Sequence, residues 1–202
     1  MYTLIGTPFA RPFRVLWALE ELGQSCELSP AKPQSEEVLK YNPGGKVPVL
    51  LDGEDAIIDS VAIVQYLADK HADLTYPAGT IKRAHQDSFT QFACDDIDSI
   101  LWTIAKNSFA LPESVRVPQV KKACEYDFAQ SMVALEKRLG DNDYVMGDRF
   151  TVPDLIIGHC AGWAIAAKLE IPKGKIADYV ERIRSRPAFI SSDKIRQSYA
   201  TK

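Results

Sequence analysis

The alternation of apolar runs and turn residues divides the first seventy residues into short elements. Residues 2–5 form an apolar run that ends at Gly6, which predicts a strand followed by a turn. Residues 11–22 repeat apolar side chains at helical spacing, and Gly23 ends that pattern. The same criteria predict these further elements: strands over 26–29, 47–51 and 56–58, and helices over 35–41 and 60–70. The predicted order is β-α-β-α-β-β-α.

The remainder of the chain has helical patterns. Tyr76-Pro77-Ala78-Gly79 breaks any helix and marks a linker. Helices are then predicted over 81–107, 117–139, 177–185 and 187–197, with a loop over 109–115. A further, buried helix is predicted to begin within residues 150–155 and to end at residue 169. The inner stripe of the first of these helices is predicted to be Phe89, Phe92, Ile97 and Leu101.

Thr151 and Asp154 have the spacing of a capping box, here with an acidic residue in the third helical position. Phe150 and Leu155 stand where a hydrophobic staple would form. We therefore interpret Asp154 as a residue that stabilises the start of a buried helix, and not as a functional group.

Composition and charge narrow the class of protein. The 202 residues carry a net charge of −3 without a long run of one sign, which argues against nucleic acid or a membrane as the main partner. We expect no signal peptide and no membrane span, because no apolar run approaches about 20 residues. The four cysteines are scattered, as in a cytoplasmic protein with reduced thiols, and the three isolated histidines suggest no metal site.

Residues 42–51 and 59–60 carry the most informative pattern. Asn42-Pro43-Gly44-Gly45 is typical of a turn, and Lys46 leads into an apolar strand. Pro48 cannot donate to a β-ladder, so Val47-Pro48 is predicted at the start of that strand, where a cis bond is compatible with the pattern. The N–H and C=O of Val47 would then be free to pair with an extended peptide.

Residues 42–50, Asn-Pro-Gly-Gly-Lys-Val-Pro-Val-Leu, followed by a hairpin and by Asp-Ser at the start of a helix, resemble the glutathione-binding half of cytosolic glutathione S-transferases. The resemblance covers nearly the whole chain. It implies an α/β N-terminal thioredoxin-like domain and an all-α C-terminal helical bundle. The corresponding boundaries are residues 1–76, a linker over 77–84, and a helical domain with the electrophile site over 85–202.

The resemblance also implies a function, namely attack of the bound glutathione thiolate on a small electrophilic or hydrophobic substrate. Glutathione would be a co-substrate and no cofactor would be permanently bound; a homodimer and a role in detoxification are also implied. Glutathione has two carboxylates, an ammonium and a thiol. The residues expected to bind it are Lys46 at the glycyl carboxylate, Val47 and Pro48 at the cysteinyl backbone, Asp59 at the ammonium, and Ser60 with the helix N-terminus at the γ-glutamyl carboxylate.

The pattern offers three candidates for the group that activates the thiol. Ala10 occupies the position of the serine in serine-type members of the family, and Gly6 that of the tyrosine in tyrosine-type members. Thr7 is a candidate hydrogen-bond donor to the sulfur, with a plain turn residue as the alternative. Arg11 is a candidate partner for an anion, with a solvated side chain as the alternative. Backbone N–H groups at the start of the helix are a third candidate, whereas Arg14 is interpreted as structural.

An apolar wall for the electrophile is expected from Phe9, Trp102, Lys106 and Phe109, although Trp102 could equally be a core residue. Two rival functions remain. The same fold could bind glutathione, a hydrophobic ligand or a protein without turnover, which Ala10 and Gly6 favour. Alternatively it could be a glutathione-dependent peroxidase.

Overall fold

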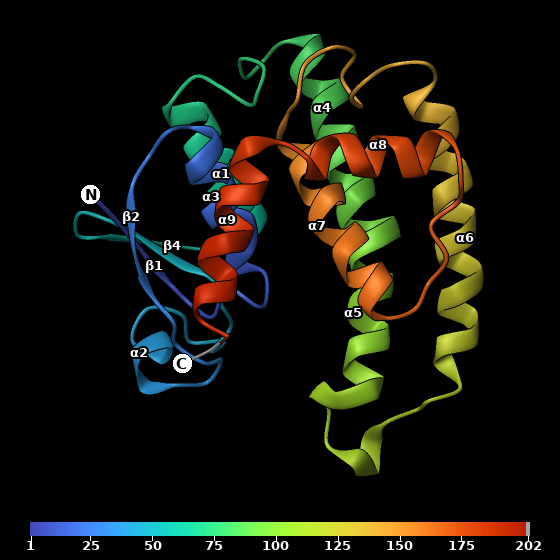
Figure 1. Cartoon of the computed structure of the whole chain (residues 1–202). Coiled ribbons are helices and arrows are strands. Elements are labelled where there is room, and N and C mark those ends of the chain that lie inside the picture. The colour runs from blue at the N-terminus through green and yellow to red at the C-terminus, as the bar shows by residue number, and fades with distance from the viewer. Residues whose placement is uncertain (201–202) are drawn as a thin grey trace. The chain divides into compact units, whose positions relative to one another are not determined.

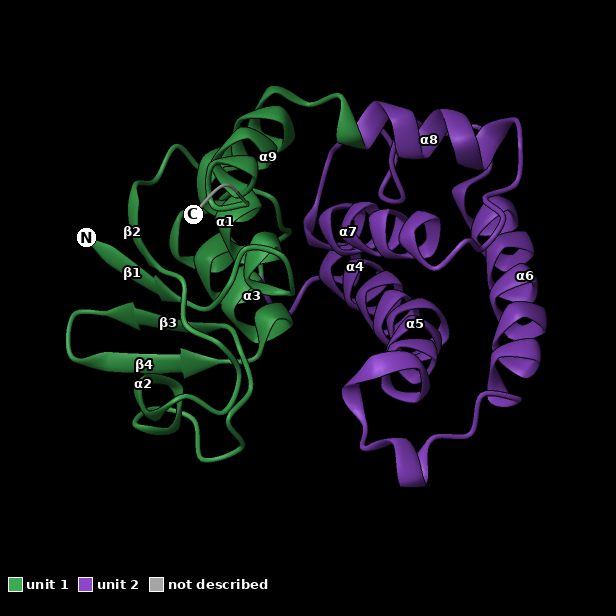
Figure 2. Ribbon diagram, turned by 60° about the horizontal axis from the view of Figure 1, so that its bottom comes forward, with its two compact units in different colours: residues 1–77, 184–202 green, residues 78–183 purple. Residues whose placement is uncertain are grey.

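A computed structural model describes residues 1–200 (Figure 1). The chain folds into two compact units (Figure 2). Unit 1 comprises residues 1–77 and the C-terminal segment from Arg184, and unit 2 comprises residues 78–183. The sequence predicted domains at 1–76 and 85–202, whereas these units place the last helix with the N-terminal part of the chain. The first helix of unit 2 also begins inside the predicted linker over 77–84.

Unit 1 contains a four-stranded sheet in the order β2-β1-β3-β4. β1 pairs in parallel with β2 and antiparallel with β3, and β3 pairs antiparallel with β4. The bounds are β1 Tyr2–Ile5, α1 Pro12–Glu21, β2 Cys26–Ser29, α2 Glu36–Leu39, β3 Val49–Asp52, β4 Asp55–Ile58 and α3 Ser60–Lys70. This order confirms the predicted β-α-β-α-β-β-α arrangement and its thioredoxin-like fold class.

The C-terminal helix α9, Pro187–Ser198, packs against α1 within unit 1 (Figure 1). The ring of Phe189 lies 5.5 Å from that of Phe13 and 4.9 Å from that of Trp17, both in edge-on geometry. Just before α9, Arg186 donates from Nε and Nη2 to the two carboxylate oxygens of Glu21, at 2.7 Å each. An aromatic contact and a bidentate ion pair therefore fix α9 to α1.

Unit 2 is built from helices, as predicted (Figure 2). Its elements are α4 Ile81–Phe92, a π-helical segment Ala93–Asp98, α5 Ser99–Ala105, a second π-helical segment Lys106–Ala110, a 3-10 turn Glu113–Val115, α6 Val120–Leu139, α7 Val152–Ala166 and α8 Lys175–Arg184. The helix predicted over 81–107 thus has two changes of winding, and the loop predicted over 109–115 is partly helical.

The inner stripe predicted for this long helix is wrong in its first half. Ile97 and Leu101 are buried, but Phe89 and Phe92 are only partly buried. The guanidinium of Arg138 lies 4.0 Å from the ring centre of Phe89 and 4.8 Å from that of Phe92. The two rings are therefore covered by a cation from α6 instead of entering the core, a contact that apolar periodicity does not reveal.

Asp154 at the start of α7 has the structural role predicted for it. Its carboxylate accepts from the N–H and Oγ1 of Thr151, at 2.8 and 2.9 Å, and from the N–H of Val145 at 3.0 Å. The hydroxyl of Tyr179 in α8 donates to it at 2.8 Å. Burial raises the pKa of Asp154, and these four hydrogen bonds act in the opposite direction.

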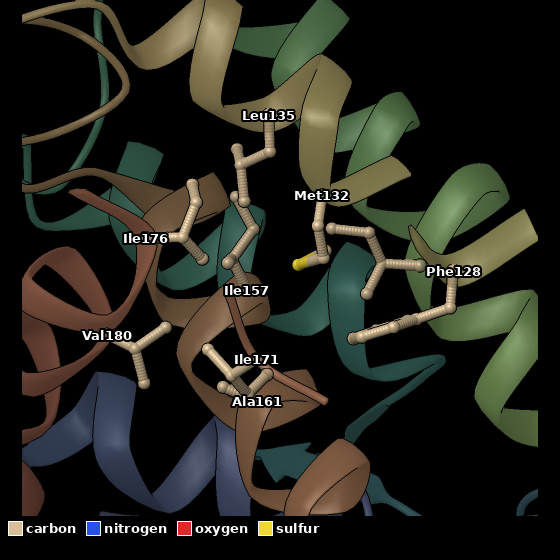
Figure 3. A pocket seen from close by; sticks show the side chains of 9 residues that line it. Phe128, Met132, Leu135, Ile157, Ala161, Ile171, Ile176 and Val180 are labelled. Atoms are coloured by element: carbon tan, nitrogen blue, oxygen red, sulfur yellow. The ribbon is translucent and has the colours of Figure 1, made fainter. Parts of the chain in front are cut away.

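A small pocket in unit 2 is lined by apolar side chains alone (Figure 3). The lining residues are Ile97, Phe128, Met132, Leu135, Ile157, Ala161, Ile171, Ile176 and Val180. Most of them are buried core residues, so the pocket is a packing space of the helical core without a polar group to orient a ligand. Among residues 1–200, no helix combines the length and the apolar character needed to span a membrane.

Candidate functional site

One end of the sheet in unit 1 gathers the residues predicted to bind glutathione. Val49 in β3 pairs with Ile5 at the end of β1 and with Ile58 at the end of β4, so these three residues form one row across the sheet. The segments that continue beyond this row therefore lie at the same end: residues 6–7, 47–48 and 59–60.

The turn before this row is built around Asn42, which is buried. Its amide donates to the carbonyl of Lys46 at 2.9 Å and its Oδ1 accepts from the N–H of Gly44 at 3.0 Å. The N–H of Gly45 donates to the carbonyl of Asn42 at 2.8 Å. The asparagine side chain thus substitutes for backbone partners that the tight turn cannot supply, and it fixes the backbone next to Val47.

Gln34 holds the same turn from outside, a contact that no sequence pattern indicated. Its N–H donates to the carbonyl of Gly45 at 2.8 Å and its Nε2 donates to the carbonyl of Gly44 at 3.1 Å. Gly45 has a φ of +63°, and a Cβ there would lie 2.3 Å from Nε2 of Gln34. The backbone angle therefore favours glycine, and any larger residue would also displace the end of the Gln34 side chain from this turn.

Val47 has the free backbone that the sequence predicted. Its peptide bond to Pro48 is cis. Neither the N–H nor the C=O of Val47 makes a hydrogen bond with another group of residues 1–200. The side chain of Val47 is partly buried, whereas Pro48 is buried. The main chain of Val47 can therefore pair with an extended peptide, donating and accepting one hydrogen bond each.

Gly6 lies directly against this segment. A Cβ on Gly6 would come within 2.6 Å of Cγ of Pro12 and 2.8 Å of Cβ of Val47, and the φ of Gly6 is +135°. No side chain can occupy position 6 without moving the start of α1 or the Val47 backbone. This packing therefore leaves no room for a tyrosine at position 6.

The start of α3 offers fewer free N–H groups than the sequence predicted. Asp59 is the N-cap, and its Oδ1 accepts from the N–H of Val61 at 2.9 Å and that of Ala62 at 3.4 Å. The N–H of Ile63 donates to the carbonyl of Asp59. The main-chain N–H of Ser60 remains without such a partner in residues 1–200. An anion here would meet this N–H and the positive end of the helix.

Lys46 and Asp59 are both exposed. The ammonium of Lys46 makes no ion pair or hydrogen bond with the rest of residues 1–200. Oδ2 of Asp59 is likewise without a hydrogen bond to the part of the chain that the structure describes. A cation next to Val47 in the sequence and a carboxylate oxygen at the same end of the sheet are therefore available, and their role in binding stays a prediction.

The start of α1 bears on one of the three candidates for thiol activation, the backbone N–H groups. The N–H groups of Phe13 and Arg14 donate to the carbonyls of Ala10 and Arg11, both at 3.0 Å, and Pro12 has no N–H. The N–H groups of Phe13 and Arg14 are therefore already used in the first turn, which leaves less backbone to stabilise a thiolate than the hypothesis assumed.

Thr7 and Arg11 remain candidates for activating the thiol. Oγ1 of Thr7 accepts a long hydrogen bond of 3.4 Å from the N–H of Phe9, as a turn residue does. This contact uses a lone pair and leaves the hydroxyl proton able to donate. Arg11 is the residue before α1 and is partly buried, and it makes no side-chain cap of the helix.

The residues predicted to form the apolar wall are divided between the units. Phe9 belongs to unit 1 and is about half exposed, whereas Trp102, Lys106 and Phe109 belong to unit 2. Trp102 and Lys106 are partly buried and Phe109 is exposed. The electrophile site stays a prediction. On the same stretch of helix, Asp95, Asp96 and Asp98 form an acidic cluster for which the sequence favours solvation; Asp98 is instead buried and accepts from the thiol of Cys160 at 3.8 Å.

Comparison with known proteins identifies the class to which this architecture belongs. Residues 2–75 match the family model for the glutathione S-transferase N-terminal domain. The crystal structure of a glutathione transferase from Methylococcus capsulatus superimposes with a TM-score of 0.85 at 26% identity, covering 98% of this chain and 100% of that one. The fold is that of the glutathione S-transferases, and the chain belongs to this family.

Two curated relatives differ in name. Glutathione S-transferase F13 of Arabidopsis thaliana is 28% identical over 88% of this chain and 87% of its own length. Elongation factor 1-gamma of Prunus avium is 30% identical over 72% of this chain, which corresponds to 35% of the elongation factor. The chain thus spans about a third of that relative. Family membership alone therefore leaves catalysis open.

Proposed function

We propose that this protein is a glutathione transferase, in which the thiolate of bound glutathione attacks a small hydrophobic electrophile. The observation that carries the proposal is the free N–H and C=O of Val47 between Lys46 and the start of α3. This arrangement matches the polarity of glutathione along its length. Lys46 would bind the glycyl carboxylate, Val47 the cysteinyl backbone, and the N–H of Ser60 the γ-glutamyl carboxylate. Asp59 would bind the ammonium through Oδ2.

Thr7 is our candidate for activating the sulfur. A thiol starts with a pKa of about 8.5, and a hydrogen bond donated to the thiolate lowers that value. The Thr7 hydroxyl has a free proton for this purpose, and it is at the same end of the sheet as Val47. Arg11 would add a positive charge at the start of α1. The product would be a thioether of glutathione, formed as the electrophile loses its leaving group or takes up a proton.

Non-catalytic binding is the second candidate. Specific observations favour it: Ala10 has no hydroxyl, Gly6 has no room for one, and the first N–H groups of α1 are bonded within the helix. Under this proposal the protein binds glutathione and leaves the pKa of the thiol unchanged.

The pH dependence of the ultraviolet absorbance of bound glutathione thiolate distinguishes the two. It would be measured for the native chain, for Thr7→Val, which has the shape of threonine without the hydroxyl, and for Thr7→Ser, which keeps it. Transferase chemistry predicts a thiol pKa below about 8.5 in the native chain and in Thr7→Ser, and a return toward that value in Thr7→Val. A low pKa in all three proteins would assign activation to Arg11. Binding without any lowering of the pKa would overturn the transferase proposal in favour of the binding protein.

A further inference from the structure

Arg14 is a buried charge directly behind the proposed site. It lies on α1 with 0% of its surface exposed, among the largest fully buried side chains of the chain. Its Nη1 donates to Oγ of Ser60, the first residue of α3, at 3.3 Å. Burying a guanidinium is unfavourable unless hydrogen bonds and charge partners compensate for its lost hydration. The contact with Ser60 thus links the charge to the end of α3 where an anion would bind.

The chemistry of the guanidinium fixes the direction of this hydrogen bond. Arginine has only donors, so the oxygen of Ser60 accepts from Arg14 and cannot use its own proton in that contact. Ser60 is 3% exposed, and its hydroxyl makes no other hydrogen bond to residues 1–200. A nearly buried hydroxyl with a proton that lacks an acceptor is an unsatisfied donor. It is satisfied when a ligand presents an acceptor at the start of α3.

We propose that Arg14 is a positioning residue for a carboxylate bound at the start of α3. It holds Ser60 as an acceptor on one side, which leaves the hydroxyl a donor toward the ligand on the other. The inference rests on the proposed function, under which this carboxylate is that of the γ-glutamyl residue of glutathione. Arg14 itself does not contact the ligand.

Two physical effects make Arg14 more than a support for the side chain of Ser60. A hydrogen bond received from a cation polarises the hydroxyl and makes it a stronger donor to an anion. The positive charge also acts on the carboxylate through the protein interior, where screening by solvent is weak. Both effects require the ligand to carry a charge at this position, and both are lost when the ligand carboxylate is removed.

The test is a double-mutant cycle with two ligands. The proteins are the native chain, Arg14→Gln, Ser60→Ala and the double variant. The ligands are glutathione and 4-aminobutyryl-cysteinyl-glycine, which lacks only the γ-glutamyl carboxylate; dissociation constants are measured by calorimetry. We expect Arg14→Gln to weaken glutathione binding by about tenfold in the native background and clearly less when Ser60 is already alanine. Neither variant should change the affinity for the analogue.

The outcomes separate this inference from the proposed function. Failure of the native chain to bind glutathione overturns both. If Arg14→Gln weakens glutathione binding equally in the presence and absence of Ser60, the positioning role is overturned. The same holds if Arg14→Gln weakens the binding of both ligands equally. In either case the proposed function is left intact.

The native chain provides a second test, which holds even if Arg14→Gln does not fold by circular dichroism. Nitrogen NMR of the Arg14 guanidinium should show a change of its resonances when glutathione binds and a much smaller one with the analogue. Equal changes with both ligands, or none with either, would also overturn the inference.

Discussion

Gly6 and Val47 are packed so closely that a Cβ on Gly6 would lie 2.8 Å from Cβ of Val47. Gly6 therefore sets the position of the backbone that we propose to pair with glutathione. Gly6→Ala should lower the free energy of unfolding by about 2 kcal/mol or more, because both the backbone angle and the contact become unfavourable. Glutathione affinity should fall as Val47 is displaced. Denaturation in urea and calorimetry measure the two effects.

Gly53 supplies the matched control for Gly6. It also has a positive φ, +64°, but a Cβ there would meet nothing within 4 Å. Gly53→Ala should therefore lose only about 1 kcal/mol from backbone strain and leave glutathione binding unchanged. Equal losses for the two variants would show that the contact with Val47 contributes nothing.

The hydrogen bond from Tyr179 to Asp154 ties α8 to the first turn of α7. Tyr179→Phe removes one donor from a buried carboxylate and should lower the free energy of unfolding by about 1.5–3 kcal/mol. Tyr126→Phe is the control, because Tyr126 is exposed on α6 and should be nearly neutral. Urea denaturation of both variants measures the two changes in the free energy of unfolding. If Tyr179→Phe left that free energy unchanged, the other three donors would already satisfy Asp154.

Arg186 should be important for keeping α9 on α1. The side chain of Glu21 is 6% exposed. Its carboxylate accepts a hydrogen bond from Nε1 of Trp17 at 2.9 Å, in addition to the two hydrogen bonds from Arg186. Arg186→Ala leaves this nearly buried charge without its cation and should lower the free energy of unfolding by about 1–3 kcal/mol. Lys175→Ala, which removes an exposed ion pair with Asp141, should have little effect on thermal unfolding. Similar effects for the two would argue against a role of Arg186 in docking α9.

The elements of unit 1 could be predicted from the sequence because turn residues interrupt them. Gly6, Gly23 and Gly53 mark the ends of strands or helices, and the predicted helix over 60–70 agrees with α3 residue for residue. Unit 2 was harder. A π-helical segment adds one residue to a turn and shifts the buried face, so Gln86 and Thr90 are buried where periodicity predicted Phe89 and Phe92.

The candidate site shows the same limit. Residue types and order predicted that Val47 has a free backbone, because proline and glycine act locally. They left two roles open for Asp59, which caps its own helix through Oδ1, and they could not predict that Arg14 reaches Ser60, which is 46 residues away. An arginine in an otherwise apolar helical stretch was the one signal for the latter, and we interpreted it as structural. Contacts between distant elements depend on packing that the sequence pattern does not specify.

Lys46 should contribute to glutathione binding through the glycyl carboxylate. Lys46→Met should weaken binding by about three- to tenfold at low salt, and less as the salt concentration rises, because an exposed charge is screened. The loss should disappear with the glycyl ethyl ester of glutathione. Lys40→Met is the control, since Lys40 is also exposed but lies over the ring of Tyr41. An equal loss for both variants would indicate a general effect of net charge.

Cys26 should react slowly with alkylating agents in the folded protein. Burial, with a smaller contribution from Glu20, raises the pKa of the Cys26 thiol from its ordinary 9.0 to about 11. The rate of alkylation by iodoacetamide should therefore rise about tenfold per pH unit beyond pH 9 in the folded chain, and should level off near pH 9 in urea. Mass spectrometry of the peptide that contains Cys26 measures the rate, and a plateau below pH 9 in the folded protein would contradict the prediction.

The same shift has a consequence for stability. Because the folded state holds the Cys26 proton more tightly than the unfolded chain, this thiol makes folding less favourable as the pH rises from about 9 to about 11. Below pH 9 the thiol is protonated in both states and has no such effect. Cys26→Ser should therefore flatten the decline of the free energy of unfolding between pH 9 and 11 and leave its pH dependence below pH 8 unchanged. It follows that Cys26 adds no thiolate absorbance over the range in which bound glutathione would titrate.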